Sequence, residues 1–255
     1  KGMPPDVLDR LFEPNFSFQA GAGGVSLAFV QYMSEMMQKH GIVADFVRGG
    51  STRYMVEMLE TGLTKFILDG QSFDLEGVRS LRDNPNHIET NPFVSYNYHT
   101  KGCFASRVKA SVLGATEIDL DFNVNVNTHS DGWLLHGIGG FTDAADAELT
   151  IITAPLVRNR VPIVVDSVTT VTAPGEMIDV LVTEMGIAIN PVRQDLIDRL
   201  KKNSLPIKSI EELHDIAIKM TGNPEKPQFR DRIVALLEFR DGTVIDVVRQ
   251  LLPRT

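Results

Sequence analysis

Short apolar runs alternate with helical repeats along the first half of the chain. Residues 16–20 form an apolar run of strand length, and from residue 25 to residue 37 apolar side chains recur at helical spacing. Gly41 follows that segment, as glycine commonly does where a helix ends. Residues 42–47 form a second apolar run, and the next helix is expected to end at Glu60. The pattern therefore predicts two successive strand–helix units.

The same alternation continues beyond residue 60. The expected elements are a strand at 65–69, a turn at 70–72, a helix at 73–81, a loop at 82–97 and a helix at 104–113 that Gly114 ends. Strands and helices in this order favour a mainly parallel or mixed sheet with helices on both faces. We therefore expect a three-layer α/β fold.

The second half of the chain has short β-branched runs separated by prolines and glycines. The expected elements are strands at 116–126, 149–153, 163–165, 178–183 and 242–248, helices at 191–203 and 210–221, and a loop at 223–227. Because no long linker interrupts this series, we expect residues 1–255 to form a single domain.

Composition narrows the class of protein. Of the 255 residues 43% are apolar and 23% charged, and no apolar run reaches the roughly 18 residues that a membrane helix needs. The net charge of −8 argues against non-specific nucleic-acid binding. Cys103 is the single cysteine and no apolar leader follows Lys1, which favours a reducing cytoplasm. The start, without methionine and with two adjacent prolines, is typical of a fragment of a longer chain.

One glycine-rich segment follows the strand predicted at 116–126. Gly137, Gly139 and Gly140 come after a polar turn. Glycines have no Cβ, so their backbone N–H groups can approach a developing oxyanion, as an acyl-handling loop requires. Taken alone, the segment is more typical of an ordinary tight turn.

A second glycine-rich segment links the first predicted strand to the first predicted helix. Gly21, Gly23 and Gly24 precede the helix, whose first N–H groups could bind a carboxylate, a phosphate or a thioester oxygen. The alternative is again a turn that binds nothing, since a lone glycine-rich turn is a weak signal.

Three charged side chains near residue 48 are candidate substrate contacts. Asp45 interrupts an apolar run, so it must find donors or stand at the carboxyl end of its strand, where open α/β sheets bind ligands. Pairing with Arg48 or capping a turn is the alternative. The guanidinium groups of Arg48 and Arg53 suit a carboxylate-rich substrate or a phosphate, although a lone surface arginine is usually only solvated.

Metal, hydrolase and NTPase motifs are not found. His99, His129, His136 and Asp131 lie near the central stretch but lack the spacing of metal ligands, so no metal site is expected. Neither a G-x-S-x-G elbow nor a P-loop occurs in the sequence.

Six segments in order along the chain carry a resemblance to a known family. They are FQAGAGGVSLA, FVRGGSTRYMVEML, FILDGQSFDLEGVRSLR, SVLGATEIDLDFNVNVNTHSDG, GIGGFTDAADAE and VTTVTAPGEMIDVLVTEMGIAINP. The chain thereby resembles the CoA-transferase superfamily, and within it the citrate lyase alpha subunits. The resemblance covers all 255 residues, matches the C-terminal half of such a subunit, and implies a CoA-transferase-like fold and a homologous N-terminal half.

The resemblance also implies an activity. A thiol carrier would move from an acetyl thioester to citrate, giving citryl thioester and acetate, before a beta subunit cleaves the citryl thioester. The carrier would be a phosphopantetheine-type group on an acyl carrier protein, with free CoA as a substitute and no covalently bound cofactor. The implied partners are the acyl carrier protein, the beta subunit, citrate and acetate, in an oligomeric complex.

The resemblance further assigns roles to residues. The oxyanion loop would be formed by Gly137, Gly139 and Gly140, and the glycines of the first turn would contact the substrate. Related acetate-dependent CoA-transferases carry a nucleophilic glutamate in a G-I-x-x-E segment, where this chain has Asp45. The shorter side chain would be drawn back by about 1 Å, so we expect Asp45 to orient groups while citrate attacks directly.

Citrate carries three carboxylates and therefore calls for cationic and polar partners. The candidates are Arg48, Arg53, His99 and Asn127. Two alternatives stay open: a related acyl-CoA:carboxylate CoA-transferase that forms a covalent intermediate at Asp45, and a non-catalytic domain that only docks the carrier protein or neighbouring subunits.

Overall fold

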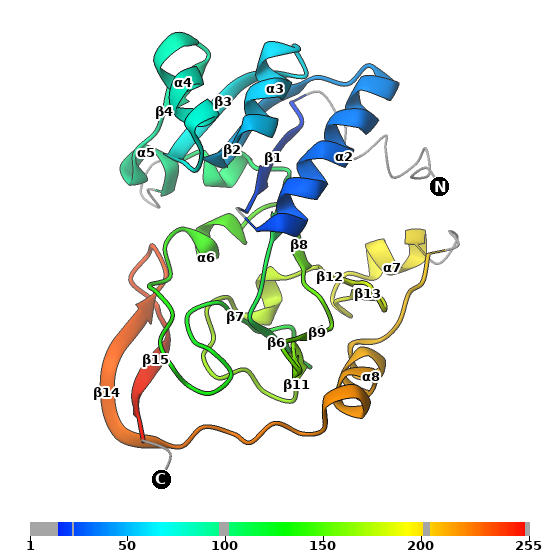
Figure 1. Cartoon of the computed structure of the whole chain (residues 1–255), viewed down its shortest axis with the longest axis vertical. Helices are drawn as coiled ribbons and strands as arrows, with labels where there is room; N and C mark the ends of the chain where they lie inside the picture. The colour runs from blue at the N-terminus through cyan, green and yellow to red at the C-terminus, as the bar shows by residue number, and fades with distance from the viewer. Residues whose placement is uncertain (1–14, 22, 97–101, 201–204, 253–255) are drawn as a thin grey trace. The chain divides into compact units, whose positions relative to one another are not determined.

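The computed structural model describes residues 15–21, 23–96, 102–200 and 205–252 (Figure 1). The chain divides into two compact units. The first consists of Lys1–Leu113 with Asp146–Leu149, and the second of Gly114–Ala145 with Thr150–Thr255. The expectation of one domain over residues 1–255 stays a prediction. Among the described residues, no helix has both the length and the apolar character needed to cross a membrane.

The first unit is built on parallel strands in the order β5-β1-β2-β3-β4. The strands are β1 (Ser17–Ala20), β2 (Ala44–Ser51), β3 (Thr64–Ser72), β4 (His87–Glu89) and β5 (Ala110–Leu113). The helices are α2 (Gly24–His40), α3 (Arg53–Glu60), α4 (Leu75–Asp83), α5 (Pro92–Tyr96) and the 3-10 turn η1 (Ala105–Arg107). The α/β prediction is confirmed.

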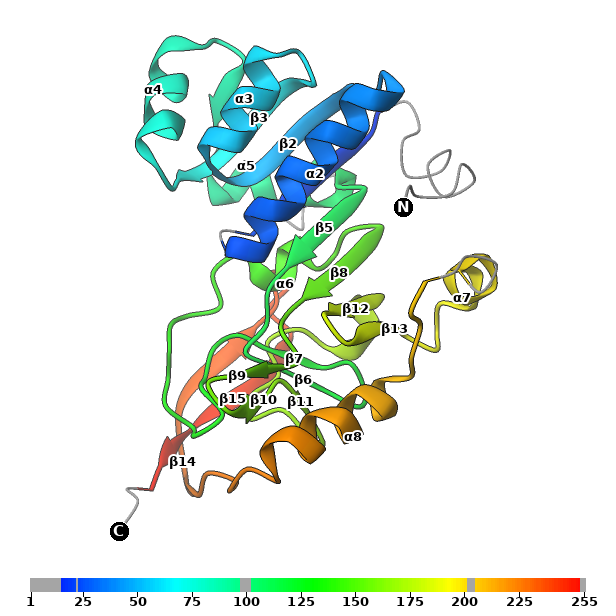
Figure 2. The ribbon, with the colours of Figure 1, turned by 45° about the vertical axis from the view of Figure 1, so that its right-hand side comes forward.

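Helices cover both faces of this sheet. Phe18, Val47 and Ile67 belong to a buried core with apolar residues of α2 and α3, which lie along the same side of the strands (Figure 2). Burial of one such side chain contributes about 1.5–3 kcal/mol. On the opposite face the Arg48 guanidinium lies 4.8 Å from the ring centre of Tyr96 in α5.

Local signals explain where the helices of the first unit begin and end. Gly41 ends α2 as predicted, with a φ of 66° that favours glycine, and its N–H reaches the carbonyl groups of Met37 and Gln38. Asp74 caps α4 by accepting from Gly77 N at 2.8 Å, and it also accepts from Arg53 N at 2.7 Å. One carboxylate therefore joins the starts of α3 and α4.

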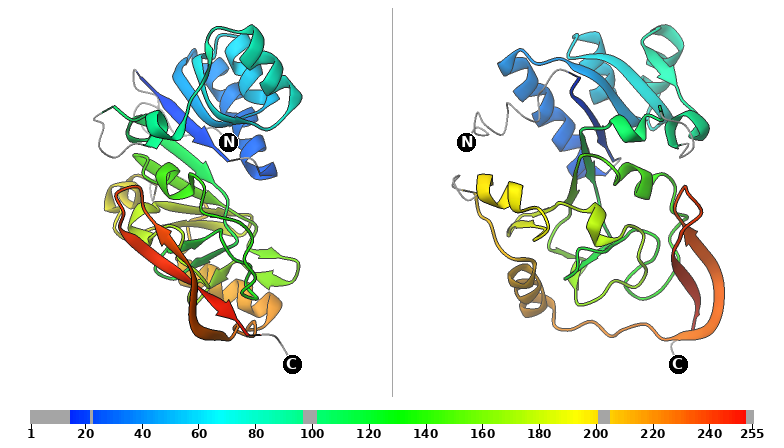
Figure 3. Two further views of the ribbon diagram at one scale, coloured as in Figure 1. Left: turned by 90° about the vertical axis from the view of Figure 1, so that its left-hand side faces the viewer. Right: turned by 180° about the vertical axis from the view of Figure 1, so that it is seen from behind.

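The second unit combines many short elements with one long hairpin. They are β6 (Glu117–Asp119), β7 (Val124–Asn125), α6 (Phe141–Ala144), β8 (Leu149–Thr153), β9 (Val157–Arg158), β10 (Val161–Pro162), β11 (Val164–Val165), η2 (Gly175–Met177), β12 (Val180–Thr183), β13 (Gly186–Ile189), α7 (Gln194–Leu200), α8 (Ile210–Thr221), β14 (Phe229–Glu238) and β15 (Val244–Leu251). Strand β6 pairs with β7 and β11, and β12 pairs with β8 and β13. Strands β14 and β15 form a long antiparallel ribbon (Figure 3).

Polar contacts help to hold this ribbon to the rest of the second unit. Asp246 of β15 accepts a hydrogen bond from Val171 N at 2.7 Å. Arg240, in the turn of the ribbon, lies 3.1 Å from Asp143 of α6. An isolated two-stranded ribbon is only marginally stable in water, so these contacts contribute to its order.

The start of helix α8 was predicted correctly, and its cap shows why. Ser209 Oγ accepts from Glu212 N at 3.2 Å, while Glu212 Oε2 accepts from Ser209 N at 2.7 Å. This reciprocal capping box fixes the helix start at Ile210.

Two predicted elements are wrong in type. Residues 104–113 do not form a helix: η1 is followed by β5, whose residues are all buried, as in a strand that is covered on both faces of a parallel sheet. Residues 116–126 do not form one strand, because the chain reverses between β6 and β7 at Phe122, which has a φ of 63°. Asp119 Oδ1 stabilises that reversal by accepting from Asn123 N at 2.9 Å.

Other predicted boundaries differ from the structure. Strand β2 begins at Ala44 and continues through the Gly49-Gly50 pair to Ser51. The predicted loop at 82–97 contains β4 and α5. Strands β13 and β14 were not predicted. Strands β13 and β14 each pair with a neighbouring strand, β12 and β15, in an antiparallel hairpin. Periodicity within a single segment does not report such pairing.

Candidate functional site

The turn after β1 is anchored at its first glycine and open beyond it. Gly21 N–H donates to Val112 O at 2.9 Å, which ties the turn to β5. A Cβ added at Gly21 would lie 3.3 Å from Ser26 Oγ, whereas one added at Gly23 or Gly24 would meet nothing within 4 Å. Gly23 is the N-cap of α2 and brings no side chain to its first N–H groups. Substrate binding by these three glycines stays a prediction.

The structure separates the two candidate arginines. Arg53 is exposed at the start of α3, next to the carboxyl end of β2, and its hydrogen bond to the Tyr54 hydroxyl raises the pKa of its guanidinium. Arg48 lies within β2 and is only 2% exposed. Of the two, Arg53 is therefore the one that an incoming carboxylate can reach in this structure.

Asp45 lies at the amino end of β2. Its N–H donates to Phe16 O at 2.7 Å, and its carboxylate lies 2.5 Å from Lys65 Nζ. The alternative that placed it at the carboxyl end of its strand is wrong, and the cation that it finds is Lys65, not Arg48. Because β1 and β2 are parallel, Asp45 and Gly21 lie at opposite ends of the same sheet. The catalytic role of Asp45 stays a prediction.

A buried carboxylate that the sequence did not reveal lies near the carboxyl end of this sheet. Asp69 Oδ2 accepts from Ser51 Oγ at 2.8 Å and from Ser72 Oγ at 2.6 Å, and lies 3.3 Å from His87 Nε2. Burial raises the pKa of Asp69, but the nearby His87 ring and the hydrogen bonds from Ser72 and Ser51 outweigh it and lower the pKa to about 2. An acid at the end of an apolar strand, followed by glycine and serine, was the available signal.

The glycine loop of the second unit leaves its amides open. Within the described residues, the backbone N–H groups of residues 137–140 have no acceptor in the protein. Gly139 has a φ of 57°, which favours glycine, and a Cβ added at Gly137 or Gly139 would meet nothing within 4 Å. The loop is exposed and leads directly into α6 at Phe141. Unpaired amides in an accessible loop can donate to an oxyanion.

Asn127 does not point into solvent. It is 2% exposed, its Oδ1 accepts from Thr172 Oγ1, and its Nδ2 donates to His136 O at 3.1 Å. Both polar ends of the side chain are therefore bonded within the protein, next to the glycine loop. Its predicted substrate contact stays a prediction.

Of the histidines considered from the sequence, the structure describes His129 and His136. His136 Nδ1 lies 2.8 Å from Gly137 O, and His129 N donates to Trp133 O at 2.8 Å. His99 lies outside the described residues. In the part of the chain that the structure describes, no group of three or more histidine, cysteine, aspartate or glutamate side chains is placed to hold a metal ion.

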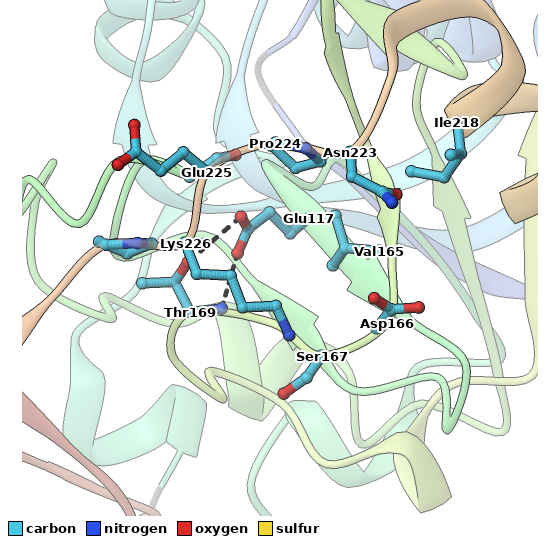
Figure 4. Close-up of a pocket in the computed structure, with 12 residues that line it drawn as sticks. Glu117, Val165, Asp166, Ser167, Thr169, Ile218, Asn223, Pro224, Glu225 and Lys226 are labelled. Carbon is cyan, nitrogen blue, oxygen red and sulfur yellow. Dashed lines mark hydrogen bonds between the residues drawn. The ribbon is translucent and has the colours of Figure 1, made fainter.

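A cavity of about 230 Å³ lies within the second unit (Figure 4). Its wall includes Glu117, whose carboxylate accepts from Asn125 Nδ2 and Thr169 N, both at 2.8 Å. Lys226 and Asp166 line the same cavity. The sequence did not predict this cavity, because segments around residues 117, 166 and 225 form it only after folding.

Comparison with known proteins identifies the family. The family described as citrate lyase, alpha subunit (CitF), matches residues 6–251. The chain belongs to the citrate lyase alpha subunit family. This confirms the resemblance inferred from the six sequence segments.

Individual citrate lyase alpha chains match over nearly the whole sequence. The Klebsiella pneumoniae chain is 51% identical over 243 residues, which is 94% of this chain and 47% of the relative. The Escherichia coli K12 chain is 47% identical over 246 residues, 96% of this chain and 48% of the relative. The chain thus spans about half the length of the curated citrate lyase relatives that it matches.

A solved citrate lyase structure shows the same fold. The alpha subunit from Streptococcus mutans, crystallised in complex with citrate, superposes with a TM-score of 0.91 at 45% identity. The match covers 96% of this chain and 49% of the solved chain. The CoA-transferase-like fold expected from the sequence is therefore confirmed.

Proposed function

We propose that the chain forms the C-terminal half of a citrate lyase alpha subunit and contributes an oxyanion-binding loop to thioester exchange. The reaction transfers a thiol carrier from an acetyl thioester to citrate and releases acetate. The observation that carries this proposal is the row of open amides at residues 137–140 in a chain of this family.

The chemistry needs little proton transfer from the protein. A citrate carboxylate attacks the acetyl carbonyl carbon, and the carrier leaves as thiolate, which gives a citric–acetic anhydride. The thiolate then attacks the citryl carbonyl carbon, and acetate leaves. Both attacks form a tetrahedral oxyanion, and one well-placed donor to such an oxyanion is worth about 2.7–4 kcal/mol.

Two further observations support citrate as the acceptor. The Streptococcus mutans relative was crystallised with citrate and is 45% identical to this chain. Arg53 is exposed at the carboxyl end of β2, where ligands of open α/β sheets bind. The proposal includes an acyl carrier protein with a phosphopantetheine-type thiol, a beta subunit that cleaves the citryl thioester, and the cytoplasm as the compartment.

The position of Asp45 supports direct attack by citrate over a covalent enzyme intermediate. Its carboxylate is paired with Lys65 at the amino end of β2, away from the Gly21 turn. Incubating the enzyme with acetyl-CoA and then with borohydride distinguishes the two routes. No reduced adduct is expected at Asp45, and an adduct there would establish the covalent alternative.

An exchange assay tests the function itself. Labelled acetate is followed into the acetyl carrier in the presence of citrate, with the full-length subunit and with the 255-residue chain. We expect the full-length subunit to catalyse this exchange. We also expect exchange to stop when the 137–140 loop is altered. Exchange that is insensitive to the loop would contradict the proposal and favour the docking alternative for this half.

A further inference from the structure

The open loop lies between two anchors that come from one buried side-chain network. At its start, His136 O accepts from Asn127 Nδ2 at 3.1 Å. At its end, Thr142 Oγ1 donates to Thr172 O at 2.8 Å. Thr172 also bonds Asn127 directly through its hydroxyl. Asn127 and Thr172 thus connect the two ends of a loop whose own amides bond to nothing else among the described residues.

The hydroxyl of Thr172 fixes which way the Asn127 amide points. Val126 N donates to Thr172 Oγ1 at 3.0 Å, so the single hydroxyl proton is free to be donated to Asn127 Oδ1. With Oδ1 occupied, the Asn127 NH₂ group faces His136 O. Loss of the hydroxyl would leave Oδ1 of Asn127 and the N–H of Val126 without a partner in a buried environment, which is costly.

The network is rigid because it is buried. Asn127 and Thr142 are each 2% exposed and Thr172 is fully buried. Asn127 is itself held through its backbone, since its N–H donates to Asn125 Oδ1 at 3.0 Å and its carbonyl accepts from Leu135 N at 2.7 Å. A buried, fully bonded support is what a preorganised site needs.

We infer that Thr172 and Asn127 are positioning residues that hold the 137–140 amides in the arrangement that receives the oxyanion. This inference rests on the proposed function of the loop. Neither side chain reaches the substrate, because both are buried and their polar atoms are bonded within the protein. They act on turnover only through the loop.

Four variants of the full-length subunit, assayed with its carrier protein, test this role. Thr172→Val removes the hydroxyl at nearly constant shape. Asn127→Asp keeps the acceptor for Thr172 and removes the donor to His136 O. Thr172→Ser retains the hydroxyl. Thr183→Val is the matched control, because Thr183 Oγ1 also donates to a backbone carbonyl, that of Gly186, but belongs to the β12–β13 hairpin and not to the network that supports the loop.

We expect the variants that break the network to change kcat and to leave KM for citrate nearly unchanged. Thr172→Val and Asn127→Asp lower kcat by about tenfold or more with KM for citrate within about twofold, because the amides serve the tetrahedral oxyanion more than the bound substrate. Thr172→Ser and Thr183→Val stay within about threefold of the parent. Hydrogen exchange, measured by mass spectrometry, becomes faster in Thr172→Val and Asn127→Asp only, at the two protected amides that flank the loop: Leu135 N, which donates to Asn127 O at 2.7 Å, and Ala144 N, which donates to Gly140 O at 2.9 Å.

The outcomes distinguish this inference from the proposed function. If Gly139→Val abolishes exchange but Thr172→Val and Asn127→Asp retain full kcat, the loop functions without the network and the inference is overturned. If Gly139→Val itself is fully active, the proposed function fails. Faster hydrogen exchange with unchanged kcat would likewise overturn the positioning role, since the loop would then tolerate disorder.

Discussion

The two glycine-rich segments of this chain have similar sequences and different structural settings. In the first unit, Gly21 donates its N–H to Val112 O, and its neighbours leave only 3.3 Å between an added Cβ and Ser26 Oγ. In the second unit, the 137–140 amides have no protein acceptor among the described residues, and the space around Gly137 and Gly139 is empty.

The difference indicates a packing role for glycine in the first segment, whereas the open amides of the second segment fit the chemical role that we propose for it. At Gly21 the missing Cβ allows the chain to turn closely beside β5 and α2. At Gly139 no neighbour requires a glycine, and the need comes from the positive φ that turns the loop. Substitution of Gly21 should therefore change stability, whereas substitution of Gly139 should change turnover.

The largest effect is expected from Gly139→Val in the full-length subunit. A β-branched residue is strained at a φ of 57°, so the loop must change its course and its amides must move. We expect kcat of acetate exchange to fall by about a hundredfold or more, equivalent to about 2.7 kcal/mol of transition-state stabilisation. The melting temperature should change little, because no packing contact is lost.

Gly137→Ala is the matched control for this variant. It adds a methyl group in the same loop, into open space and without a positive φ, so kcat should stay within about threefold. A hundredfold loss in Gly137→Ala, or unchanged turnover in Gly139→Val, would mean that the contrast between the two glycine segments does not reflect function.

The sequence alone predicted the order of strands and helices from β1 to α4. Each strand there is followed closely by its own helix, so local periodicity carries the information. It misassigned residues 104–113, because Ala110, Val112 and Leu113 are buried in a strand covered on both faces, where apolar spacing does not distinguish strand from helix. Phe122, at the reversal between β6 and β7, gave no turn signal, since bulky residues rarely adopt a positive φ.

The candidate site was predictable only in part. The glycine loop was found because its composition is unusual, and the family order of the six segments supported it. The hydrogen bonds that Asn127 and Asp69 make were not predicted, because the partners are far apart in sequence. Thr172 lies 45 residues from Asn127 along the chain, and Asp69 lies 18 residues from Ser51. Such hydrogen bonds depend on tertiary contacts that no local spacing encodes.

The second largest expected effect is on the stability of the first unit, and it depends on pH. The Asp69 carboxylate joins β2 and β3 through Ser51 and Ser72 near the carboxyl end of the sheet. Its pKa is lowered from 3.8 to about 2 on folding, so the ionised form stabilises the native state by about 2 kcal/mol above pH 4. That contribution is lost as the pH falls from about 4 towards 2, where the carboxyl group becomes protonated in the native state too.

Asp69→Asn should therefore lower the free energy of unfolding by about 2 kcal/mol at pH 7 and leave the difference much smaller near pH 2. Denaturant titrations at several pH values measure this. Acetate exchange per folded molecule should stay within about threefold, because Asp69 is not part of the loop. A pH-independent loss of stability would show that the ionised carboxylate is not the source of the effect.

A smaller effect on stability is expected from Gly21→Val. The added side chain is crowded by Ser26 Oγ at 3.3 Å, and its Cβ lies 3.8 Å from Val112 O. Crowding of this size costs about 1 kcal/mol when a neighbour can move slightly. Gly23→Ala is the control, since its Cβ would meet nothing within 4 Å. Equal stability losses in the two variants would argue against the packing role that distinguishes Gly21.

The smallest effect is expected from Asp45→Asn, and it decides where the chemistry takes place. The carboxylate is 28% exposed and its partner Lys65 is 58% exposed, so the ion pair contributes about 0–1 kcal/mol to stability. If citrate attacks the thioester directly, no enzyme carboxylate is acylated, and acetate exchange should stay within about threefold of the parent. Lys65→Gln breaks the same ion pair and should behave alike.

A hundredfold loss confined to Asp45→Asn would instead place an essential carboxylate at the amino end of β2, opposite to the Gly21 turn. The contrast between the two glycine segments would then no longer locate the reaction, because the Gly21 turn lies at the other end of that sheet.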